Sequence, residues 1–564
     1  MTTGPIKSGK DDKGHLFQRR EKKFMMKNRK KLAGVLATAT VLTSAFAPLT
    51  VMAEDFDAYN PPVAEVEAGQ IKGFMDDNTY TFLGVPYAAS ERFQMPQKVE
   101  AWDGVYNAQA YGKTCKIPEQ TSVGSDEMLW PHRYWIQGED CQNLNIWTQQ
   151  LDETAKKPVL VFFHGGGYNN GSSIESAAYD GKNLSEYGDA VVVTVNHRLN
   201  ALGFLDLSAY GDEYENTGNL GIADLVASLQ WIKDNIETFG GDPDNVTIFG
   251  QSGGGGKVLT LMKTPAAEGL FDKVICESAV FGRIDNTQEV TQQAAAYTLE
   301  NLGLDESQVD ELKTMDYTDL VTAGASAYDK ITEERGKIAF NTRGYAWAPS
   351  VDNKYVMEDY CDWAADIPVM IGSTFAEFDY SWNILDGKKN EWTEEETMAN
   401  LTDRYGDKAQ EIADEFAKVF PDQKLADAYF YSGFMRETVA ELLSAKLKDA
   451  TAPVYSYLFD YEAPVNGGGV AFHCSELIYA FHNVDIPVVT RATGGGEDAH
   501  KVQDVVATAW LNFAKTGSPS QDGLEWKPYT EDEQNTMVLK EESECRDLGD
   551  ETLRGLIMSA LGQE

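Results

Sequence analysis

The stretch Phe249–Val258 reads FGQSGGGGKV, in which four consecutive glycines stand between a serine and a lysine. Glycine-rich loops of this kind either wrap the phosphates of a nucleotide or expose a nucleophilic serine. A P-loop needs glycine, four spacers and then Gly-Lys-Ser/Thr, but Gln251 stands at the first glycine position and Val258 at the hydroxyl position. The dinucleotide pattern G-x-G-x-x-G has no register here either. The pattern that fits is G-x-S-x-G, with Ser252 as the candidate nucleophile.

Apolar runs upstream of this motif predict alternating strands and helices. Residues 159–163 and 190–195 are continuous apolar runs, typical of strands that are buried on both faces of a mostly parallel sheet. Between Leu220 and Phe239 the apolar residues recur at spacings of three and four. This spacing predicts an amphipathic helix, which Gly240 and Gly241 end.

The motif itself falls between a predicted strand and a predicted helix. Residues 246–249 form a short apolar strand pattern, and residues 257–262 have helical potential. A nucleophilic serine requires this sharp turn, with small neighbours that let the two backbones approach. An alternative stays open at this point, in which the turn is only glycine-rich and Ser252 caps a helix.

An oxyanion-binding loop is indicated directly after the first apolar run. His164-Gly165-Gly166-Gly167-Tyr168 follows residues 159–163, and glycines there leave backbone N–H groups free to point into a site. On this interpretation Gly166 and Gly167, together with the N–H of Gly253 after the serine, form the oxyanion hole. A plain glycine-rich strand exit is the alternative. We expect His164 itself to be structural.

The base is expected to be one of seven histidines. Folds with this serine motif order the chain as serine, acid and histidine, which leaves His473, His482 and His500 downstream. His473 follows the glycine run at residues 467–469. His482 lies in an apolar region, where a packed histidine is expected.

The acid is expected near the end of a later strand. Residues 367–372 predict a buried strand, and Glu377 lies in the loop just past its end, where catalytic groups of such sheets gather. Spacing alone does not separate Glu377 from Glu358 or Asp379.

Composition excludes several other classes of function. The 564 residues are 42% hydrophobic and carry a formal net charge of −41, which disfavours binding to nucleic acid or to anionic membranes. There is no C-x-x-C, and no histidine pair has metal-ligand spacing. We therefore expect no metal and no cofactor, and a small-molecule substrate as the partner.

The first 53 residues are predicted to be an export signal with an extended basic leader. They hold 11 Lys and Arg against 3 Asp and Glu, and a basic cluster at residues 27–31 precedes an apolar run from Leu32 to Val51. Small or aliphatic residues then precede a cleavage point at Glu54. The run is interrupted by polar residues and Pro48, so we expect a secreted, extracellular protein without a stable membrane anchor. Residues 54–564 are predicted to form a single catalytic domain.

Several segments in a fixed order resemble the signatures of one family. The chain resembles the type-B carboxylesterases, the family of the cholinesterases and the bacterial p-nitrobenzyl esterases, from about Val63 to about Leu539. The segments that carry the resemblance are Phe82–Ala88, Glu139–Asn145, His164–Tyr168, Gly218–Gly221, Trp231–Ile236, Phe239–Pro243 and Trp510–Gly517.

The resemblance implies an α/β-hydrolase fold with a large, mostly parallel sheet flanked by helices. It also implies the triad Ser252, Glu377 and His473, since Glu377 matches the acid loop of the family and His473 its histidine segment. Cys115 and Cys141 match a disulfide loop of the family. Arg92 with Glu139, and Arg198 with Asp224, resemble its structural ion pairs.

The implied activity is hydrolysis of carboxylic esters through an acyl-enzyme intermediate. Two residues depart from the pattern, because the family usually has Glu before the nucleophile and Ala after it, whereas this chain has Gln251 and Gly253. The missing carboxylate disfavours cationic choline esters as substrates. Alternatives are an amidase or thioesterase, or a binding or adhesion protein that keeps the fold without catalysis.

Overall fold

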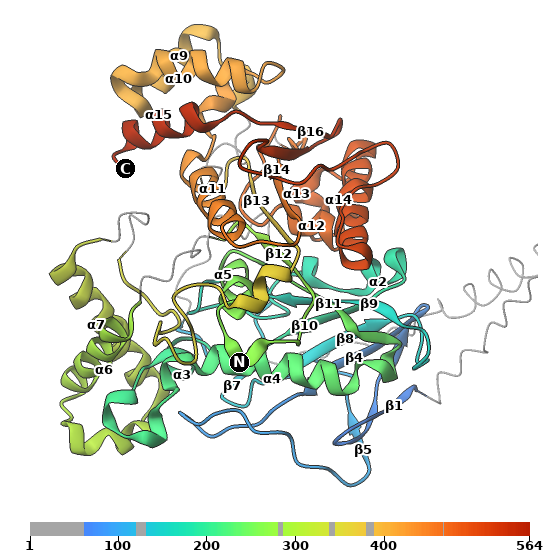
Figure 1. Ribbon diagram of the computed structural model, residues 1–564, viewed down its shortest axis with the longest axis vertical. Coiled ribbons are helices and arrows are strands. Elements are labelled where there is room, and N and C mark those ends of the chain that lie inside the picture. Colours follow the sequence, from blue (N-terminus) through green and yellow to red (C-terminus); the bar gives the residue numbers. More distant parts are fainter. Residues whose placement is uncertain are drawn as a thin grey trace, which may run out of the picture. The chain divides into compact units, whose positions relative to one another are not determined.

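The computed structural model describes residues 61–119, 131–279, 286–337, 344–378, 388–465 and 467–563. All of them belong to one compact unit, Tyr59–Glu564, and the predicted leader at residues 1–53 lies outside the described residues. The main feature is an eleven-stranded sheet (Figure 1). Its strands are, in spatial order, β16 (Glu544–Asp547), β15 (Asn535–Leu539), β14 (Val454–Phe459), β13 (Val369–Thr374), β12 (Lys273–Glu277), β11 (Gly241–Gln251), β9 (Lys157–Phe163), β10 (Val191–Val195), β8 (Asn143–Thr148), β4 (Thr79–Pro86) and β3 (Phe74–Asp76).

The sheet is mostly parallel, as predicted. Every neighbouring pair from β15 to β10 is parallel. Antiparallel pairing is confined to β16 at one edge and to β8, β4 and β3 at the other. Two smaller sheets consist of β1 (Val63–Val66), β2 (Gly69–Lys72) and β5 (Val105–Asn107), and of β6 (Thr114–Cys115) and β7 (Gln137–Gly138).

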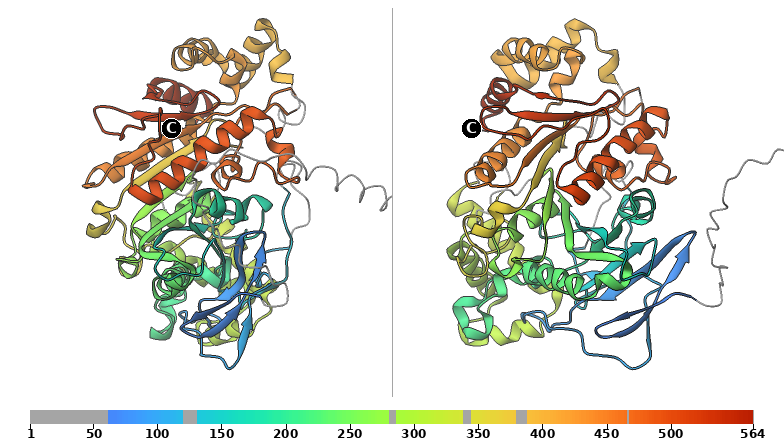
Figure 2. Two further views of the ribbon diagram at one scale, coloured as in Figure 1. Left: turned by 90° about the vertical axis from the view of Figure 1, so that its right-hand side faces the viewer. Right: turned by 45° about the vertical axis from the view of Figure 1, so that its right-hand side comes forward.

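Helices cover both faces of the large sheet (Figure 2). The α-helices are α2 (Lys182–Gly188), α3 (Asn200–Phe204), α4 (Leu220–Asn235), α5 (Gly253–Leu261), α6 (Gln288–Leu302), α7 (Tyr317–Arg335), α9 (Glu394–Tyr405), α10 (Ala409–Val419), α11 (Gly433–Leu447), α12 (Glu476–Ala480), α13 (Thr490–Thr493), α14 (Glu497–Thr516) and α15 (Glu551–Leu561).

The apolar runs of the sequence explain this layering. In β9, Val159, Val161 and Phe163 join one core with α4 and α11, while Leu160 and Phe162 join a second core with α2, α12 and α14. Successive side chains of a strand point to opposite faces, so a continuous apolar run is buried on both. The predicted doubly covered sheet is therefore confirmed.

Elements around the serine motif agree with the predictions in kind and differ in their ends. The predicted helix at residues 220–239 is α4, continued by a 3₁₀ turn at Ile236–Phe239 and ended by Gly240 with a φ of 75°. The helix after the serine begins at Gly253 rather than at Lys257, so the four glycines lie inside it. Packing overrides the poor helix propensity of glycine here, because the first turn of α5 lies against neighbouring backbone.

The expected disulfide is absent from the structure. Cys115 and Cys141 are free, buried thiols, and Cys115 Sγ accepts a hydrogen bond from the backbone N–H of Leu199 at 3.2 Å. A hydrogen bond to Cys115, with burial, raises the pKa of the Cys141 thiol well above its usual value. The two thiols are neighbours without a covalent bond.

Both expected ion pairs are present. Arg198 Nε and Nη2 donate to the two carboxylate oxygens of Asp224 at 2.8 and 2.7 Å, and the pair is buried. Arg92 makes the same two-pronged contact with Glu139 and also binds the carbonyl oxygens of residues 312 and 315. Such forked contacts fix the two partners in orientation as well as distance. Within the described ranges, no helix combines the length and apolar character needed to cross a bilayer.

Candidate active site

Ser252 lies on the turn between β11 and α5 in a strained conformation. Its φ of 58° and ψ of −119° belong to a region that residues other than glycine rarely adopt. The backbone is held there by two hydrogen bonds, from Ser252 N–H to the carbonyl of Glu277 at 2.8 Å and from Gly256 N–H to the carbonyl of Ser252 at 3.0 Å. The residue is 9% exposed. A strained turn between a strand and a helix is the backbone setting that this serine motif requires of a nucleophile.

The glycines after the serine are required by close backbone contact. A Cβ atom on Gly253 would lie 2.4 Å from the carbonyl oxygen of Gly167, and one on Gly254 would lie 1.9 Å from that of Phe163. These distances are far below van der Waals contact. The start of α5 therefore packs directly on the end of β9 and on the loop that follows it.

That loop contains the predicted oxyanion hole. Gly166 and Gly167 have positive φ angles of 82° and 63°, which turn successive peptides in a way that suits glycine. Asn170 N–H closes the turn on the carbonyl of Gly166 at 3.0 Å. No acceptor in the described part of the chain binds the N–H groups of Gly166, Gly167 or Gly253. The three predicted donors therefore lie on two segments that contact each other, Gly166 and Gly167 on the loop after β9 and Gly253 at the start of α5.

Glu377 and His473 are hydrogen-bonded to each other. The contact joins His473 Nδ1 to Glu377 Oε2. A carboxylate at Nδ1 favours the tautomer with the proton on Nδ1, which leaves the lone pair of Nε2 free to accept a proton. The pair therefore has the arrangement of an oriented base.

Backbone pairing sets the position of this pair. The loop after β13 forms a short parallel ladder with the histidine segment, through Ala376 N–H to Ala471 O at 2.9 Å and His473 N–H to Glu377 O at 3.0 Å. Glu377 has a φ of 46°, and its Oε1 accepts from Thr374 N–H at 2.8 Å. A carboxylate held at both oxygens cannot rotate away from the imidazole.

The amide of Gln251 lies against the imidazole. Gln251 Nε2 is 3.3 Å from Nδ1 and 3.2 Å from Nε2 of His473. An atom equidistant from both ring nitrogens lies over the ring face, because an in-plane position would overlap the carbon between them. The ring of Phe378 also lies on the imidazole, with centroids 4.2 Å apart. No hydrogen bond joins the described side chains of Ser252 and His473, and the contact between their segments is made by Gln251, the residue before the serine.

Two further carboxyls are buried behind Glu377. Ser278 Oγ donates to Glu377 Oε1 at 2.7 Å and reaches Glu476 Oε1 at 3.2 Å. Trp510 Nε1 donates to Glu277 Oε1 at 2.7 Å. Burial raises the pKa of Glu277 to about 8, and burial, with the nearby Glu277 and Glu377 charges, raises that of Glu476 well above its usual value. These two carboxyls favour the protonated form, which limits the negative charge beside Glu377.

The other predicted histidines lie outside this cluster. His482 Nε2 pairs with Asp504 at 2.9 Å and His500 Nε2 with Asp485 at 2.8 Å, and both aspartates are exposed. His164 is buried, as expected of a structural residue. Of the alternative acids, Glu358 is exposed, and Asp379 lies outside the described residues.

The profile of the carboxylesterase family matches residues 60–554. The chain belongs to the carboxylesterase family. It is 32% identical over 493 residues to the para-nitrobenzyl esterase of Bacillus subtilis, which covers 85% of this chain and 95% of that protein. It is 31% identical over 505 residues to the phenmedipham hydrolase of Pseudarthrobacter oxydans, with the same two coverages. A solved esterase from anaerobic Clostridium hathewayi, which can hydrolyse aliphatic aromatic polyesters, has a TM-score of 0.81 and 39% identity, and covers 89% of this chain and 99% of that one.

The predicted family and its α/β-hydrolase fold are thereby confirmed, and this carboxylesterase is a carboxylic ester hydrolase. Sequence reasoning missed Glu277 and Ser278, which the carboxylesterase places behind its candidate acid. A signal was available, because both residues come at the end of a strand, β12, that neighbours the serine strand in the sheet.

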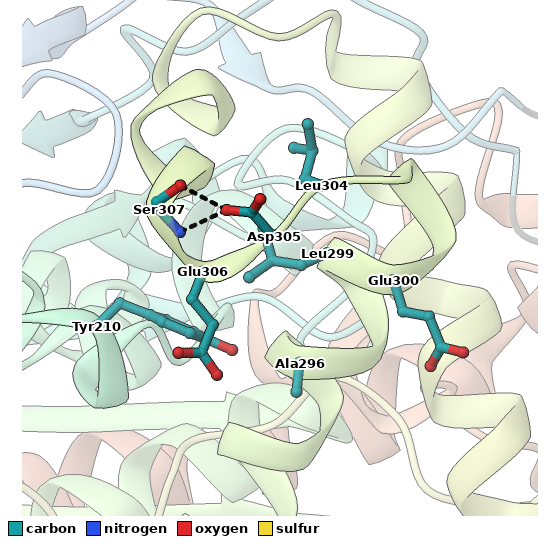
Figure 3. A pocket seen from close by; sticks show the side chains of 8 residues that line it. All are labelled: Tyr210, Ala296, Leu299, Glu300, Leu304, Asp305, Glu306 and Ser307. Carbon is teal, nitrogen blue, oxygen red and sulfur yellow. Dashed lines mark hydrogen bonds between the residues drawn. The ribbon is translucent and has the colours of Figure 1, made fainter.

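The carboxylesterase also has an open groove of about 530 Å³ away from these residues (Figure 3). Its lining includes Glu300, Asp305 and Glu306, and none of the candidate catalytic residues. Asp305 caps the 3₁₀ helix Glu306–Lys313, accepting from Ser307 N–H at 2.9 Å. The groove lies between the C-terminal part of α6 and the start of the 3₁₀ helix, and the contact of Asp305 is explained by its role as a helix cap.

Proposed function

We propose that this carboxylesterase is a secreted serine esterase that acts through an acyl-enzyme, with Ser252 as nucleophile, His473 as base and Glu377 as the acid that orients it. The observation that carries the proposal is the pairing of Glu377 with Nδ1 of His473 beside a strained serine turn. Hydrogen bonds between nucleophile and base are often long before substrate binds.

In the acylation step the Ser252 hydroxyl attacks the ester carbonyl and His473 Nε2 takes its proton. The carbonyl oxygen becomes an oxyanion, which the N–H groups of Gly166, Gly167 and Gly253 bind. His473 then gives the proton to the leaving alcohol as the carbon–oxygen bond breaks, leaving an acyl-serine. Glu377 stabilises the charged imidazolium throughout.

In the deacylation step water replaces the alcohol. His473 takes a proton from the water as its oxygen attacks the acyl carbon, and the same three N–H groups bind the second oxyanion. The proton then returns to Ser252 Oγ as the carboxylic acid leaves. The same serine, the same base and the same oxyanion hole therefore act in both acylation and deacylation.

The test is hydrolysis of p-nitrophenyl butyrate by the purified protein and by Ser252→Ala. We expect kcat to fall by at least about 10⁴-fold in the variant, with an unchanged circular dichroism spectrum. A fluorophosphonate probe should label the protein once, on the peptide that contains Ser252. Turnover that survives the substitution, or a label elsewhere, would contradict the proposed nucleophile.

We expect uncharged esters to be preferred over cationic ones. Gln251 is neutral and lies against His473, at the position where the family usually has a carboxylate. Without that charge, a cationic alcohol group has no nearby partner of opposite sign from this residue. A kcat/KM for butyrylthiocholine equal to that for an uncharged butyrate ester would contradict this expectation.

The secreted location rests on the basic and apolar leader at residues 1–53. Expression of the whole chain in a bacterial host, followed by sequencing of the exported protein, should give Glu54 as the first residue. A product that keeps the leader and stays with the membrane would contradict cleavage.

A further inference from the structure

Lys257 is a buried lysine at the back of the candidate oxyanion loop. It lies in α5, five residues after Ser252, and its side chain has no exposed surface. Its Nζ donates a hydrogen bond to the carbonyl oxygen of His164 at 2.7 Å. His164 is the first residue after β9 and opens the loop that contains Gly166 and Gly167. One side chain therefore joins the helix that starts at the nucleophile to the loop that supplies two oxyanion donors.

The surroundings of Lys257 are poor ones for a charged amine. Across the described residues no carboxylate lies within ion-pair distance of its Nζ, and the ring of Tyr168 is 5.8 Å away. Burial lowers the pKa of Lys257 to about 7, and the charge of Glu175 only partly opposes this shift. Burial, reinforced by the Lys257 charge, also lowers the pKa of His164 well below its usual value. A buried amine with this little compensation costs stability, so an apolar residue would be the better choice for packing alone.

Another buried lysine shows what ordinary compensation looks like. Lys389 Nζ binds Asp427 at 2.7 Å and Glu462 at 2.8 Å, so its charge is matched by two carboxylates. Lys257 instead donates its one described hydrogen bond to a backbone carbonyl of the oxyanion loop. Buried groups with perturbed pKa values are frequent at functional sites. The function of Lys257 is therefore sought in its contact with the carbonyl of His164.

The carbonyl of His164 sets the plane of the peptide that leads into the glycines. Gly165, Gly166 and Gly167 have wide conformational freedom, so the loop has little rigidity of its own. Asn170 fixes the far side of the turn through the carbonyl of Gly166. The Lys257 contact fixes the near side. Together with the contact of His164 Nδ1 on the carbonyl of Gly165 at 2.8 Å, these two contacts restrain the three successive peptides from His164 to Gly167, which carry the N–H groups of Gly165, Gly166 and Gly167.

We propose that Lys257 is a positioning residue for the oxyanion hole, which it holds in the geometry of the transition state through the carbonyl of His164. This inference rests on the proposed function. The lysine touches neither substrate nor reacting atoms. Its loss should therefore lower transition-state binding and leave ground-state binding of the ester nearly unchanged.

The test compares Lys257→Met with Lys446→Met. Lys446 is a matched control in α11, because it is also buried, donates to the backbone carbonyl of Ala364 at 2.6 Å, and has a pKa lowered by burial to about 8. Both substitutions remove the amine and keep an unbranched stem of four heavy atoms. The measurements are kcat and KM for p-nitrophenyl butyrate, Ki for an alkyl trifluoromethyl ketone as transition-state analogue, and Tm.

For Lys257→Met we expect kcat to fall by about 100-fold, Ki for the ketone to rise by a similar factor, and KM to stay within about 3-fold. For Lys446→Met we expect kcat, KM and Ki within about 3-fold, whatever the change in Tm. Should Lys257→Met fail to fold, Lys257→Leu, which also lacks an N–H donor, takes its place with the same expected separation of Ki from KM.

Unchanged kcat and Ki in Lys257→Met would overturn the inference, as would a loss that appears in KM alone. Failure of both Lys257 variants to fold would assign the lysine to stability and overturn it as well. The proposed function fails in a different way, since wild-type protein would then neither hydrolyse the ester nor bind the ketone.

Discussion

The two halves of the candidate site are built from different materials. On the β9 and α5 side the candidate groups are backbone N–H groups of Gly166, Gly167 and Gly253, in segments packed backbone against backbone. On the β12 and β13 side they are side chains, with Glu377 and His473 backed by buried carboxyls. The described atoms nearest to Gly166 and Gly253 are backbone atoms, whereas the second half is crowded with carboxyls.

Because of this difference, we expect the two halves to respond to different kinds of substitution. The backbone half depends on sterics, because a single added carbon meets a neighbouring carbonyl at less than 3.0 Å. The side-chain half depends on which groups carry protons, because several carboxyls lie together out of water. Substitutions of the glycines in the first half should act through geometry and be independent of pH. Substitutions in the second should act through charge and tautomer.

The largest effect is expected in the side-chain half, from Glu377→Gln. The amide keeps the size of the side chain, but its NH₂ can donate to His473 Nδ1 and so favour the wrong tautomer. We expect kcat to fall by about 10³- to 10⁴-fold, with KM changed by less than about 3-fold, in assays with p-nitrophenyl butyrate. Glu358→Gln, at an exposed acid outside the cluster, is the matched control and should leave kcat unchanged. A fall of less than tenfold in Glu377→Gln would show that another group orients the imidazole.

A smaller effect is expected in the backbone half, from Gly253→Ala. The new Cβ would lie 2.4 Å from the carbonyl oxygen of Gly167, so the loop must shift and its donors move with it. We expect kcat to fall by about 10- to 100-fold, equally from pH 6 to pH 9, because a displacement near 1 Å weakens oxyanion binding.

Gly555→Ala is the matched control for this substitution. Gly555 also lies in a helix, α15, and an added Cβ there meets no atom within 4 Å. We expect full activity and a gain in stability of up to about 1 kcal/mol, from helix propensity. Full activity in Gly253→Ala would mean that the loop shifts without loss, as it must in relatives with alanine at this position.

Secondary structure was predicted best from the sequence where the spacing of neighbouring residues determines it. The apolar runs at residues 159–163 and 190–195 gave β9 and β10, and the glycine pair at residues 240–241 gave the end of a helix. The start of α5 was predicted four residues late, because four glycines argue locally against a helix. The motif predicted small residues that let two backbones approach, but it did not predict that the end of β9 and its loop are the backbone that α5 approaches.

The residues of the candidate site also divide into those that a local motif predicts and those that it does not. Ser252 was predicted from its motif, but spacing left Glu377 among three acids, and the family resemblance was needed to choose it. Glu277 carries no motif, and the contacts of Glu476 and Lys257 do not follow from the motifs beside which these residues stand. Their roles arise from contacts between residues far apart in the chain, such as Trp510 with Glu277. The expected disulfide shows the converse error, since a family pattern was matched while the two thiols remain unbonded.

The smallest effect on activity is expected from Glu277→Gln, and its signature is in the pH dependence of stability. Burial raises the pKa of Glu277 from 4.5 to about 8, so between these values the folded protein holds a proton that the unfolded chain has released. The contribution of Glu277 to stability is therefore complete below pH 4.5 and is lost as the pH rises to about 8, with a slope of up to about 1.4 kcal/mol per pH unit. Glutamine keeps an oxygen to accept from Trp510 Nε1 and has no proton to lose. In urea titrations from pH 5 to pH 8, Glu277→Gln should thus lose less stability than wild type, while kcat at pH 7 stays within about 3-fold. Equal slopes in both proteins would mean that Glu277 is ionised in the folded state, and the contrast between a steric half and a proton-dependent half would then be lost.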